Sequence, residues 1–428
     1  MAGLRAYQLL SFLAWPFFWA LLLRRRLVGK ELAYRVRERR GIATKVRGKG
    51  FLIWFHGASV GETLSILPLA TYMLERFPQV ELLITSGTLA SANLIQSRLP
   101  DRAQHQFLPL DHPLWVDRFL QTWRPDVGIW AESEIWPNLI RRCQGLNIPL
   151  HLVNARLSDT SYRRWLRQFR FARTLFGVFE SLIAQSKRDV ERLEMLGGHS
   201  PVNGGNIKFA GGALPASKTE IEAWRATFSG RPTWFASSTH PGEEALVLKV
   251  HEQLQERHPN LLTIIAPRHL ERLSDLQINL LADKPHALYS EGPDLVSPHS
   301  LLLIDQMGVL GPIYQTCGIA LVAGSLLPHI GGHNPIEPAR NGAAVLVGQH
   351  MDNQSDLVEI FLAADALIQI SDVESLTDAV DALLTDPERC AELQARGAAL
   401  VQAQSDVLRL YSSALVPKIE ATLEARNR

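Results

Sequence analysis

Short apolar runs recur along this chain, and each is followed by a polar or glycine-bearing loop and then a stretch of helical length. The first run, residues 51–55, precedes a loop at 56–62 and an amphipathic stretch that continues to Phe77. Such alternation predicts a parallel β-sheet with α-helices on both faces, the α/β class. The strands that we expect in this half are 51–55, 80–84, 106–108, 127–130, 150–153 and 182–184.

The pattern breaks into Gly, Ala, Pro and Ser around 204–218, which indicates a linker. A second series then begins, with expected strands at 233–236, 261–266 and 319–323. The chain has 428 residues, enough for two or three domains. We therefore expect two Rossmann-like domains facing across a cleft, at 27–210 and 211–428, with helices closing the second domain. Polar clusters follow the strands of the first domain, where parallel sheets bind ligands, at 59–62, 85–88, 132–134 and 154–158.

The N-terminal run 7–23 is uncharged and rich in Leu, Phe and Trp, and it stops at three arginines. This composition predicts that residues 1–26 form a membrane-anchor helix. The run is at the low end of the length needed to span a membrane, and Pro16 would kink it. A cleaved signal peptide is the competing interpretation, but positive charge lies on the wrong side for it. Residues 24–49 carry eleven basic residues against Glu31 and Glu38. The positive-inside rule then keeps the body cytoplasmic, beside anionic headgroups.

The composition bears on which partners the protein binds and on the state of its cysteines. Lys and Arg number 44 against 43 Asp and Glu, which gives no reason to expect nucleic acid. The three cysteines are widely separated and lack metal or redox spacing, which suggests buried thiols in a reducing compartment.

The stretch 324–350 holds a glycine-rich loop after an apolar strand, with Asn334, Pro335 and Glu337 opening an expected helix. Glycines allow close backbone approach, and a helix N-terminus attracts anions, so Gly324 is expected in a phosphate-binding turn. A carboxylate cannot favour the phosphate, and Glu337 is better suited to a ribose diol. The alternative is a plain strand-to-helix turn whose Glu serves only the helix dipole.

Eight segments together resemble the Kdo transferases, which move 3-deoxy-D-manno-octulosonic acid (Kdo) from CMP-Kdo to a lipid A precursor. The segments are WFHGASVGE (54–62), LPLDHP (108–113), ESEIWPN (132–138), NARLS (154–158), GNIKF (205–209), ASSTHPGEE (236–244), APRHLER (266–272) and GSLLPHIGGHNPIEPA (324–339). The resemblance covers almost the whole chain. It implies the GT-B glycosyltransferase fold, an inverting transfer in lipopolysaccharide synthesis, and a location at the inner membrane with the catalytic body on the cytoplasmic side.

The resemblance also implies roles for single residues. Glu62 matches the catalytic base, although it could instead be a helix-start carboxylate that satisfies backbone donors. Glu134 matches a second acidic residue, acceptor-side or structural. The residues that match the nucleotide-sugar site are Pro267, Arg268, His269, Gly308, Gly324, Ser325, Asn334 and Glu337. Among these, the guanidinium of Arg268 suits a phosphate.

One departure concerns Val309, which stands where the family usually has a carboxylate. Because of this departure, one alternative function is a membrane-tethered nucleotide-binding module without catalysis. The other alternative is a GT-B enzyme that acts on a different nucleotide sugar or lipid acceptor. His329 and His333 could be mistaken for a metal pair, but glycines lie between them and the chain has no DxD triplet. A CMP donor has one phosphate, so we expect neither a metal requirement nor another cofactor.

Residues 162–176 interleave arginines with aromatic residues. At helical spacing, Arg163, Arg164 and Arg167 fall near one face, which would suit a phosphorylated glycolipid acceptor. An ordinary solvated basic face over an apolar stripe is an equally good interpretation.

Overall fold

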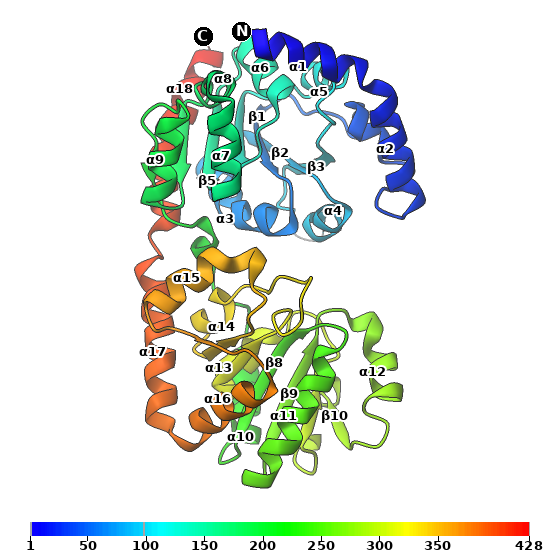
Figure 1. Ribbon diagram of the computed structural model, residues 1–428, viewed down its shortest axis with the longest axis vertical. Helices are drawn as coiled ribbons and strands as arrows, with labels where there is room; N and C mark the ends of the chain where they lie inside the picture. The colour runs from blue at the N-terminus through cyan, green and yellow to red at the C-terminus, as the bar shows by residue number, and fades with distance from the viewer. Residues whose placement is uncertain (1, 97–98, 428) are drawn as a thin grey trace. The chain divides into compact units, whose positions relative to one another are not determined.

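The computed structural model describes residues 2–96 and 99–427 and divides the chain into two compact units (Figure 1). The first unit is made of residues 1–211 and 405–428, and the second of residues 212–404. Each unit is built around its own parallel sheet, and the two are described separately below.

The sheet of the first unit has seven strands in the order β3-β2-β1-β4-β5-β6-β7, all paired in parallel. The strands are β1 (Phe51–Gly57), β2 (Val80–Ser86), β3 (Ala103–Phe107), β4 (Val127–Ala131), β5 (Leu150–Ala155), β6 (Ser181–Ala184) and β7 (Val202–Asn203). They include the six strands predicted from the sequence. The order reverses between β1 and β4, and ligands of open α/β sheets bind beyond the strand ends at such a switch point.

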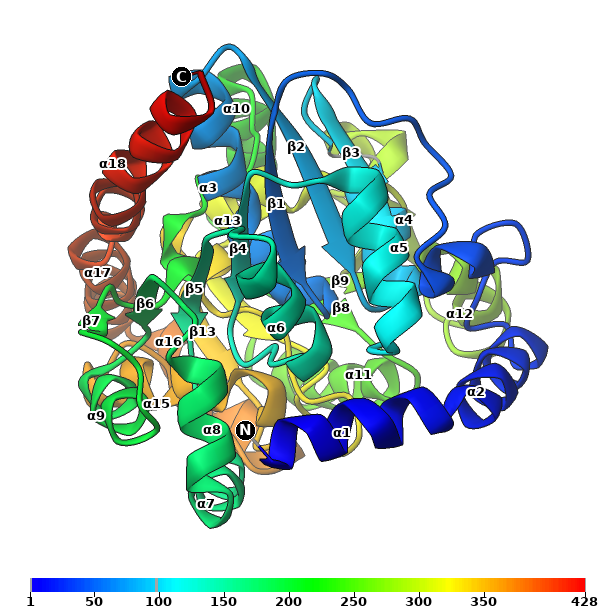
Figure 2. The same ribbon diagram turned by 90° about the horizontal axis from the view of Figure 1, so that it is seen from above.

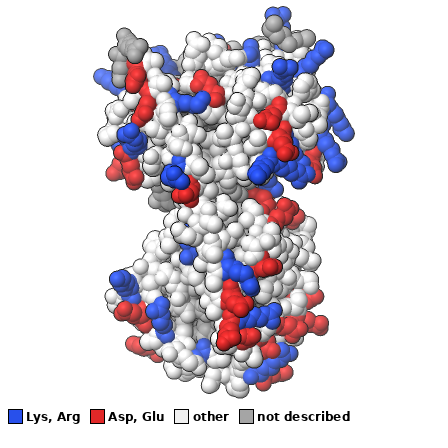
Figure 3. Space-filling model, turned by 90° about the vertical axis from the view of Figure 1, so that its left-hand side faces the viewer, with Lys and Arg blue, Asp and Glu red and all other residues white. Residues whose placement is uncertain are grey.

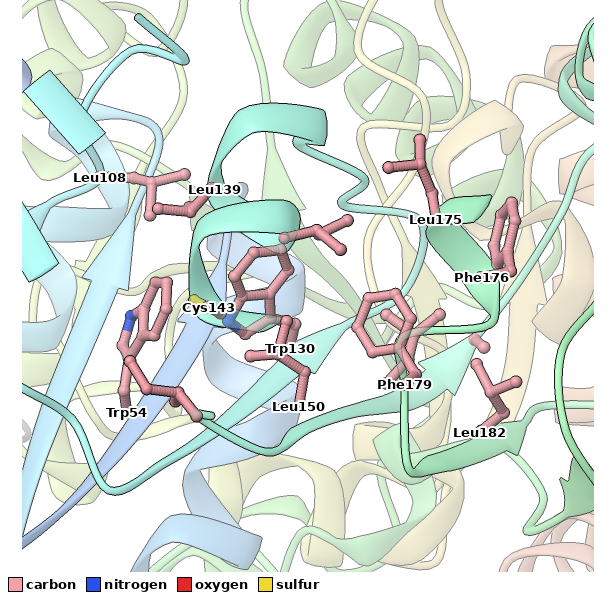
Figure 4. Packing of buried hydrophobic residues seen from close by; sticks show 14 of the residues in the cluster. Trp54, Leu108, Trp130, Leu139, Cys143, Leu150, Leu175, Phe176, Phe179 and Leu182 are labelled. Atoms are coloured by element: carbon pink, nitrogen blue, oxygen red, sulfur yellow. The ribbon is translucent and has the colours of Figure 1, made fainter. Parts of the chain in front are cut away.

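Helices cover both faces of this sheet (Figure 2). They are α1 (Ala2–Leu13), α2 (Trp15–Leu27), η1 (Val36–Arg40), α3 (Val60–Arg76), α4 (Leu89–Gln96), α5 (Pro113–Trp123), α6 (Pro137–Gly145), α7 (Asp159–Arg167), α8 (Phe169–Phe176), α9 (Lys187–Met195), η2 (Ile207–Ala210) and α18 (Val407–Asn427). The core on one face is rich in aromatic rings (Figure 4). Trp54 and Trp130 meet edge to face at 5.0 Å, and Phe179 packs beside Trp130.

The last helix corrects the predicted domain boundary. We expected residues 405–428 to close the second domain, but α18 packs on the first unit. Tyr411 is fully buried there and its hydroxyl donates to the Gly205 carbonyl at 2.8 Å. Lys418 donates to the Glu180 carbonyl, also in the first unit. An apolar helical stripe shows that α18 needs a partner, but the stripe does not identify which unit supplies it.

The N-terminus differs from a single anchor helix. In the described part of the chain, no one helix is long and apolar enough to cross a membrane; α1 and α2 pass that test only as a pair bent by 56°. The bend comes at Ala14, just before Pro16 in the first turn of α2. One side of α1 is fixed to the first unit, because the Tyr7 hydroxyl donates to Asp111 at 3.0 Å and Asn138 donates to the Ser11 hydroxyl at 2.8 Å.

The sheet of the second unit also has seven strands, in the order β10-β11-β9-β8-β12-β13-β14, again all parallel. The strands are β8 (Thr233–Thr239), β9 (Leu262–Pro267), β10 (His286–Leu288), β11 (Leu301–Leu303), β12 (Ile319–Val322), β13 (Ala344–Val347) and β14 (Ile368–Gln369). Three of these were predicted. The order reverses between β8 and β12, which makes the loops after these strands the switch point of this unit.

The helices of the second unit are α10 (Lys218–Phe228), α11 (Glu243–Arg257), η3 (Leu270–Arg272), α12 (Leu273–Asn279), η4 (Tyr289–Glu291), η5 (Pro293–Leu295), α13 (Leu310–Cys317), α14 (Ile336–Arg340), η6 (Asp352–Gln354), α15 (Ser355–Ala363), α16 (Val373–Thr385) and α17 (Pro387–Ala403). Apolar clusters fill both faces of the sheet, one around Trp234 and one around Phe235. Alternate residues of β8 therefore serve opposite faces, as strand geometry requires.

Candidate active site

The loop after β1 lies at the switch point of the first unit and leads into α3, whose first turn contains Glu62. Ser59 caps α3: its hydroxyl accepts from the Glu62 N–H at 3.2 Å and donates to the Glu62 carboxylate at 2.8 Å. The other carboxylate oxygen accepts from the Ala58 N–H, also at 2.8 Å. Glu62 thus has the helix-start role that was the alternative interpretation. A carboxylate has about four acceptor positions, and Glu62 remains partly exposed, so this role leaves room for a substrate hydroxyl.

Glu134 lies beside Glu62, in the loop after β4. Burial raises the pKa of Glu62 above its ordinary value and the neighbouring Glu134 raises it further, against the lowering effect of the Ala58 and Ser59 hydrogen bonds. For Glu134, burial also acts to raise the pKa, but hydrogen bonding and charge at His56, with the Trp136 indole, outweigh burial and lower it. Two neighbouring carboxyl groups whose pKa values are pushed apart are a recurring arrangement in acid–base sites.

His56 is a site residue that sequence reasoning missed. It is the penultimate residue of β1 and fully buried, yet it contacts Thr85 on β2 and Glu134 after β4. The signal was present, since a histidine in an otherwise apolar strand needs a polar partner. The sequence could not show that this partner is one of the two candidate carboxylates.

Backbone strain also collects at this end of the sheet. Glu132, directly after β4, has φ 57°, and Asn154, near the end of β5, has φ 54°. The β5–β6 register shifts between Leu152 and Ala155, around Asn154. The Asn154 side chain accepts from the Ile207 N–H at 3.0 Å, which ties the strained strand to η2. Left-handed conformations in non-glycine residues persist only where the surroundings enforce them, and they are common at functional sites.

The predicted basic helix is interrupted. It forms two helices, α7 and α8, that break at Gln168, so the arginines of 162–176 do not share one helical face. Arg163, Arg164 and Arg167 are exposed on α7, and Leu166 and Phe169 are exposed beside the break. Elsewhere charge is mixed: on the face drawn in Figure 3, Lys and Arg lie among Asp and Glu.

In the second unit, Glu243 at the start of α11 occupies the switch point. Its buried carboxylate accepts from three backbone N–H groups: His240 at 2.9 Å, Gly324 at 2.8 Å and Leu326 at 2.9 Å. This corrects the phosphate-turn prediction for Gly324, because the protein's own carboxylate takes the amide that we expected to meet a ligand.

The Ser325 hydroxyl is likewise used within the protein. The residue is fully buried, and its hydroxyl donates to the Val322 carbonyl at 2.6 Å and accepts from the Gly348 N–H at 2.8 Å. Gly324 itself has φ 71°, with His333 close to where a Cβ would stand. The Gly324 amide and the Ser325 hydroxyl thus shape the turn through contacts within the protein.

A group of cationic and imidazole side chains lies at the ends of β8 and β9 instead. His240 and His333 stack, with their Nε2 atoms 2.9 Å apart, and the ring of His269 meets His240 at 5.6 Å. Burial, together with the nearby His240, Arg268 and His269, lowers the pKa of His333 to about 4. The Arg268 guanidinium makes no hydrogen bond or ion pair with any described residue, although Arg272 nearby pairs with Glu244 at 2.9 Å. This group, His240, Arg268, His269 and His333, is suited to an anion.

The remaining predicted donor-site residues lie at other loop ends. Pro267 is the last residue of β9, and Gly308, with φ 86°, has open space around its Cα before α13. Asn334 lies just before α14 and its side chain accepts from the Ile336 N–H at 3.0 Å, while Glu337 is exposed on the helix. The predicted helix is present but only five residues long.

Two further findings concern residues 2–96 and 99–427. No group of three or more His, Cys, Asp or Glu residues in them is placed to hold a metal ion. Val309, where a carboxylate was expected, is partly buried and packs against the apolar cluster around Phe235.

Comparisons with known proteins agree with this description. The family model for 3-deoxy-D-manno-octulosonic-acid transferase (kdotransferase) matches residues 34–211. A 3-deoxy-D-manno-octulosonic acid transferase of Rickettsia bellii is 35% identical over 91% of this chain and 93% of its own. A probable mitochondrial 3-deoxy-D-manno-octulosonic acid transferase of Arabidopsis thaliana is 33% identical over 97% of this chain and 94% of its own.

Among solved structures, the UDP-GlcNAc 2-epimerase of Neisseria meningitidis bound to UDP-GlcNAc has a TM-score of 0.54. It covers 86% of this chain and 100% of its own at 14% identity, which supports the fold alone. The identity to these relatives over nearly their full length places this chain in the 3-deoxy-D-manno-octulosonic acid transferase family of glycosyltransferases.

Proposed function

We propose that this chain transfers Kdo from CMP-Kdo to a lipid A precursor with inversion at the anomeric carbon, and that Glu62 is the general base. The observation that carries the proposal is a partly exposed carboxylate at a switch point, whose pKa is raised by burial and by Glu134. A raised pKa makes a carboxylate a better proton acceptor for a sugar hydroxyl as that hydroxyl attacks.

The test is to incubate the purified protein with CMP-Kdo and a tetra-acylated lipid A precursor and to measure CMP release and the lipid product. Glu62→Gln keeps the shape of the side chain and removes its basicity, so turnover should fall about a hundredfold to ten-thousandfold while CMP affinity stays unchanged. Glu75→Gln, at an exposed position of the same helix, is the matched control. Near-normal turnover in Glu62→Gln, or a product with retained configuration, would refute the assignment.

For the donor, we assign the phosphate of CMP-Kdo to Arg268 with His240, His269 and His333. The support is a guanidinium that has no hydrogen bond or ion pair to any described residue and lies among three imidazoles at a switch point, since a guanidinium binds phosphate through several coplanar donors. Asn334, Glu337 and Gly308 remain the proposed nucleotide contacts, with Pro267 shaping the loop. Full activity in excess EDTA is expected for a site in which side chains neutralise one phosphate, and loss of activity that magnesium restores would contradict it.

For location, we propose that α1 and α2 lie in the surface of the inner membrane on its cytoplasmic side. The support is a two-sided helix pair: the contacts of Tyr7 and Ser11 fix one side to the protein, and large apolar side chains are exposed on the other. These are Leu9, Leu10, Phe12, Leu13, Trp15, Phe17, Trp19, Leu23 and Leu27. Basic residues next to such a surface add attraction to anionic lipid, and the exposed arginines of α7 suit the phosphates of the acceptor.

A further inference from the structure

The hydrogen bonds of His56 determine which of its ring nitrogens carries hydrogen. Nδ1 lies 3.1 Å from the Thr85 carbonyl and 2.9 Å from the Thr85 hydroxyl oxygen. That hydroxyl already accepts from the Trp54 indole at 2.8 Å and directs its own hydrogen to the Phe55 carbonyl at 3.3 Å. Both oxygens that face Nδ1 are therefore acceptors, so Nδ1 must be the donor.

The other ring nitrogen then has a single acceptable state. Nε2 lies 3.4 Å from a Glu134 carboxylate oxygen, which also accepts from the Trp136 indole at 2.8 Å. With hydrogen on Nδ1 alone, Nε2 would point a lone pair at the lone pairs of a carboxylate. The contact is favourable only if a second proton lies between Nε2 and the oxygen, as imidazolium with carboxylate or as neutral ring with carboxylic acid. Either form has no net charge.

We propose that His56 is a positioning residue: its proton neutralises Glu134 and leaves Glu62 as the carboxylate of this site that acts as the base. The inference deepens the proposed function and rests on Glu62 being that base. Without the proton on His56, the adjacent carboxylates of Glu62 and Glu134 would compete for a single proton. Glu62 would then be held protonated over part of the working pH range.

The surroundings of Glu62 support this account. Glu134 and His56 are the charged side chains that act on Glu62, one raising its pKa and the other lowering it. Of the other elements packed on α3, η2 carries Lys208, and α18 pairs Glu420 with Arg76 near the far end of the helix. By fixing the charge of Glu134, His56 therefore acts directly on the pKa of Glu62.

The test is the pH dependence of kcat/KM in the full-length protein, measured by CMP release for wild type, His56→Gln, Glu134→Gln and the double variant. Glu62 must be ionised to act, so activity falls on the acid side. His56→Gln should move this acid limb upward by about one pH unit, because Glu134 then carries an uncompensated charge. Glu134→Gln should leave the limb close to wild type, because a neutral amide then replaces a carboxyl group whose charge His56 already compensates, and the double variant should also lie close to wild type.

An upward shift in His56→Gln that disappears in the double variant would support the inference, because a merely structural role lowers kcat without moving the limb. A limb that superimposes on wild type in folded His56→Gln would overturn it, and so would a downward shift in Glu134→Gln, because that shift would show that Glu134 carries an uncompensated charge in wild type. If His56→Gln does not fold, by circular dichroism and CMP binding, Glu134→Gln still supplies this second test. Failure of the parent proposal has a different signature, since Glu62→Gln would then retain turnover at every pH.

Discussion

The Glu243 carboxylate offers the sharpest stability test of the second unit. It has no exposed surface and joins three backbone N–H groups from two separate segments, around His240 and around Gly324 and Leu326. Glu243→Gln keeps the length of the side chain and replaces one oxygen with an NH₂ group. In its better orientation the amide oxygen keeps the His240 and Gly324 bonds, and the NH₂ group faces the Leu326 N–H.

The cost follows from these contacts. One charge-assisted hydrogen bond is lost, worth about 1.5–3 kcal/mol, and two others become neutral bonds, weaker by about 1 kcal/mol each. Relief from burying a charge offsets part of this loss. The net destabilisation should be about 2–3 kcal/mol, which for a unit of this size lowers the Tm by roughly 5–10 °C.

Differential scanning calorimetry can measure the shift, with Glu256→Gln at an exposed position of the same helix as the matched control. The variant should also bind CMP more weakly, because the His240 and Gly324 segments flank the proposed phosphate site. If Glu243→Gln melts together with the control and wild type, the three hydrogen bonds do not hold this turn and the reasoning is wrong.

Three other predictions follow from the structure. Arg268→Ala or Glu337→Ala should weaken CMP binding roughly tenfold or more by calorimetry, since charge-assisted bonds contribute about 1.5–3 kcal/mol; unchanged affinity in both would contradict the donor site. Leu10→Asp combined with Phe17→Asp should reduce flotation with anionic vesicles at least tenfold relative to Ile278→Asp, an equally exposed control in the second unit, and equal flotation would refute the surface anchor. Burial raises the pKa of Asp111 to about 6 from 3.8, so the native state holds more protons than the unfolded state in between. The stability of wild type relative to Asp111→Asn should therefore fall as pH rises from about 4 to 6 in urea titrations, and a rise over that interval would reverse the argument.

The sequence predicted the strands that bury several consecutive apolar residues. Those are the central strands, such as β1 and β8, whose composition differs plainly from the adjoining loops. The exception is β13 (Ala344–Val347), which is fully buried and was also missed. The other missed strands are short: β7 and β14 have two residues each, and β10 and β11 have three. Such short strands are defined by their neighbours' hydrogen bonds rather than by their own composition, so periodicity carries little signal for them.

The site was predicted unevenly for a related reason. Single residues such as Glu62 and Arg268 could be named from motifs, but the contacts that decide their chemistry join distant segments. Gly324 looked like a phosphate turn because nothing nearby in sequence shows that a carboxylate 81 positions earlier occupies its amide. His56 likewise acquires meaning only when β1 pairs with β2 and β4 follows at its other edge.

The two units offer a controlled comparison of one local pattern. In each, the first strand of the unit is followed by a short loop and a helix that starts with a Gly-Glu pair, Gly61-Glu62 in the first turn of α3 and Gly242-Glu243 at the start of α11. In both, the Glu accepts backbone N–H groups, which is the ordinary use of a carboxylate at a helix start. The two carboxylates differ in their burial and in the acceptor positions that the backbone leaves free. Glu243 is fully buried and its oxygens are used by three amides from two segments, so it can only hold a turn together.

Glu62 accepts from one amide and one hydroxyl of its own loop and stays partly exposed. A second carboxyl group and a histidine lie next to it, and neither is required to build the helix start. The same dipeptide thus holds a turn together in one unit and contains the proposed base in the other. Burial and the residues on neighbouring strands determine which of these two roles the Glu has. Glu62→Gln should therefore cost activity with little loss of stability, and Glu243→Gln should cost stability first.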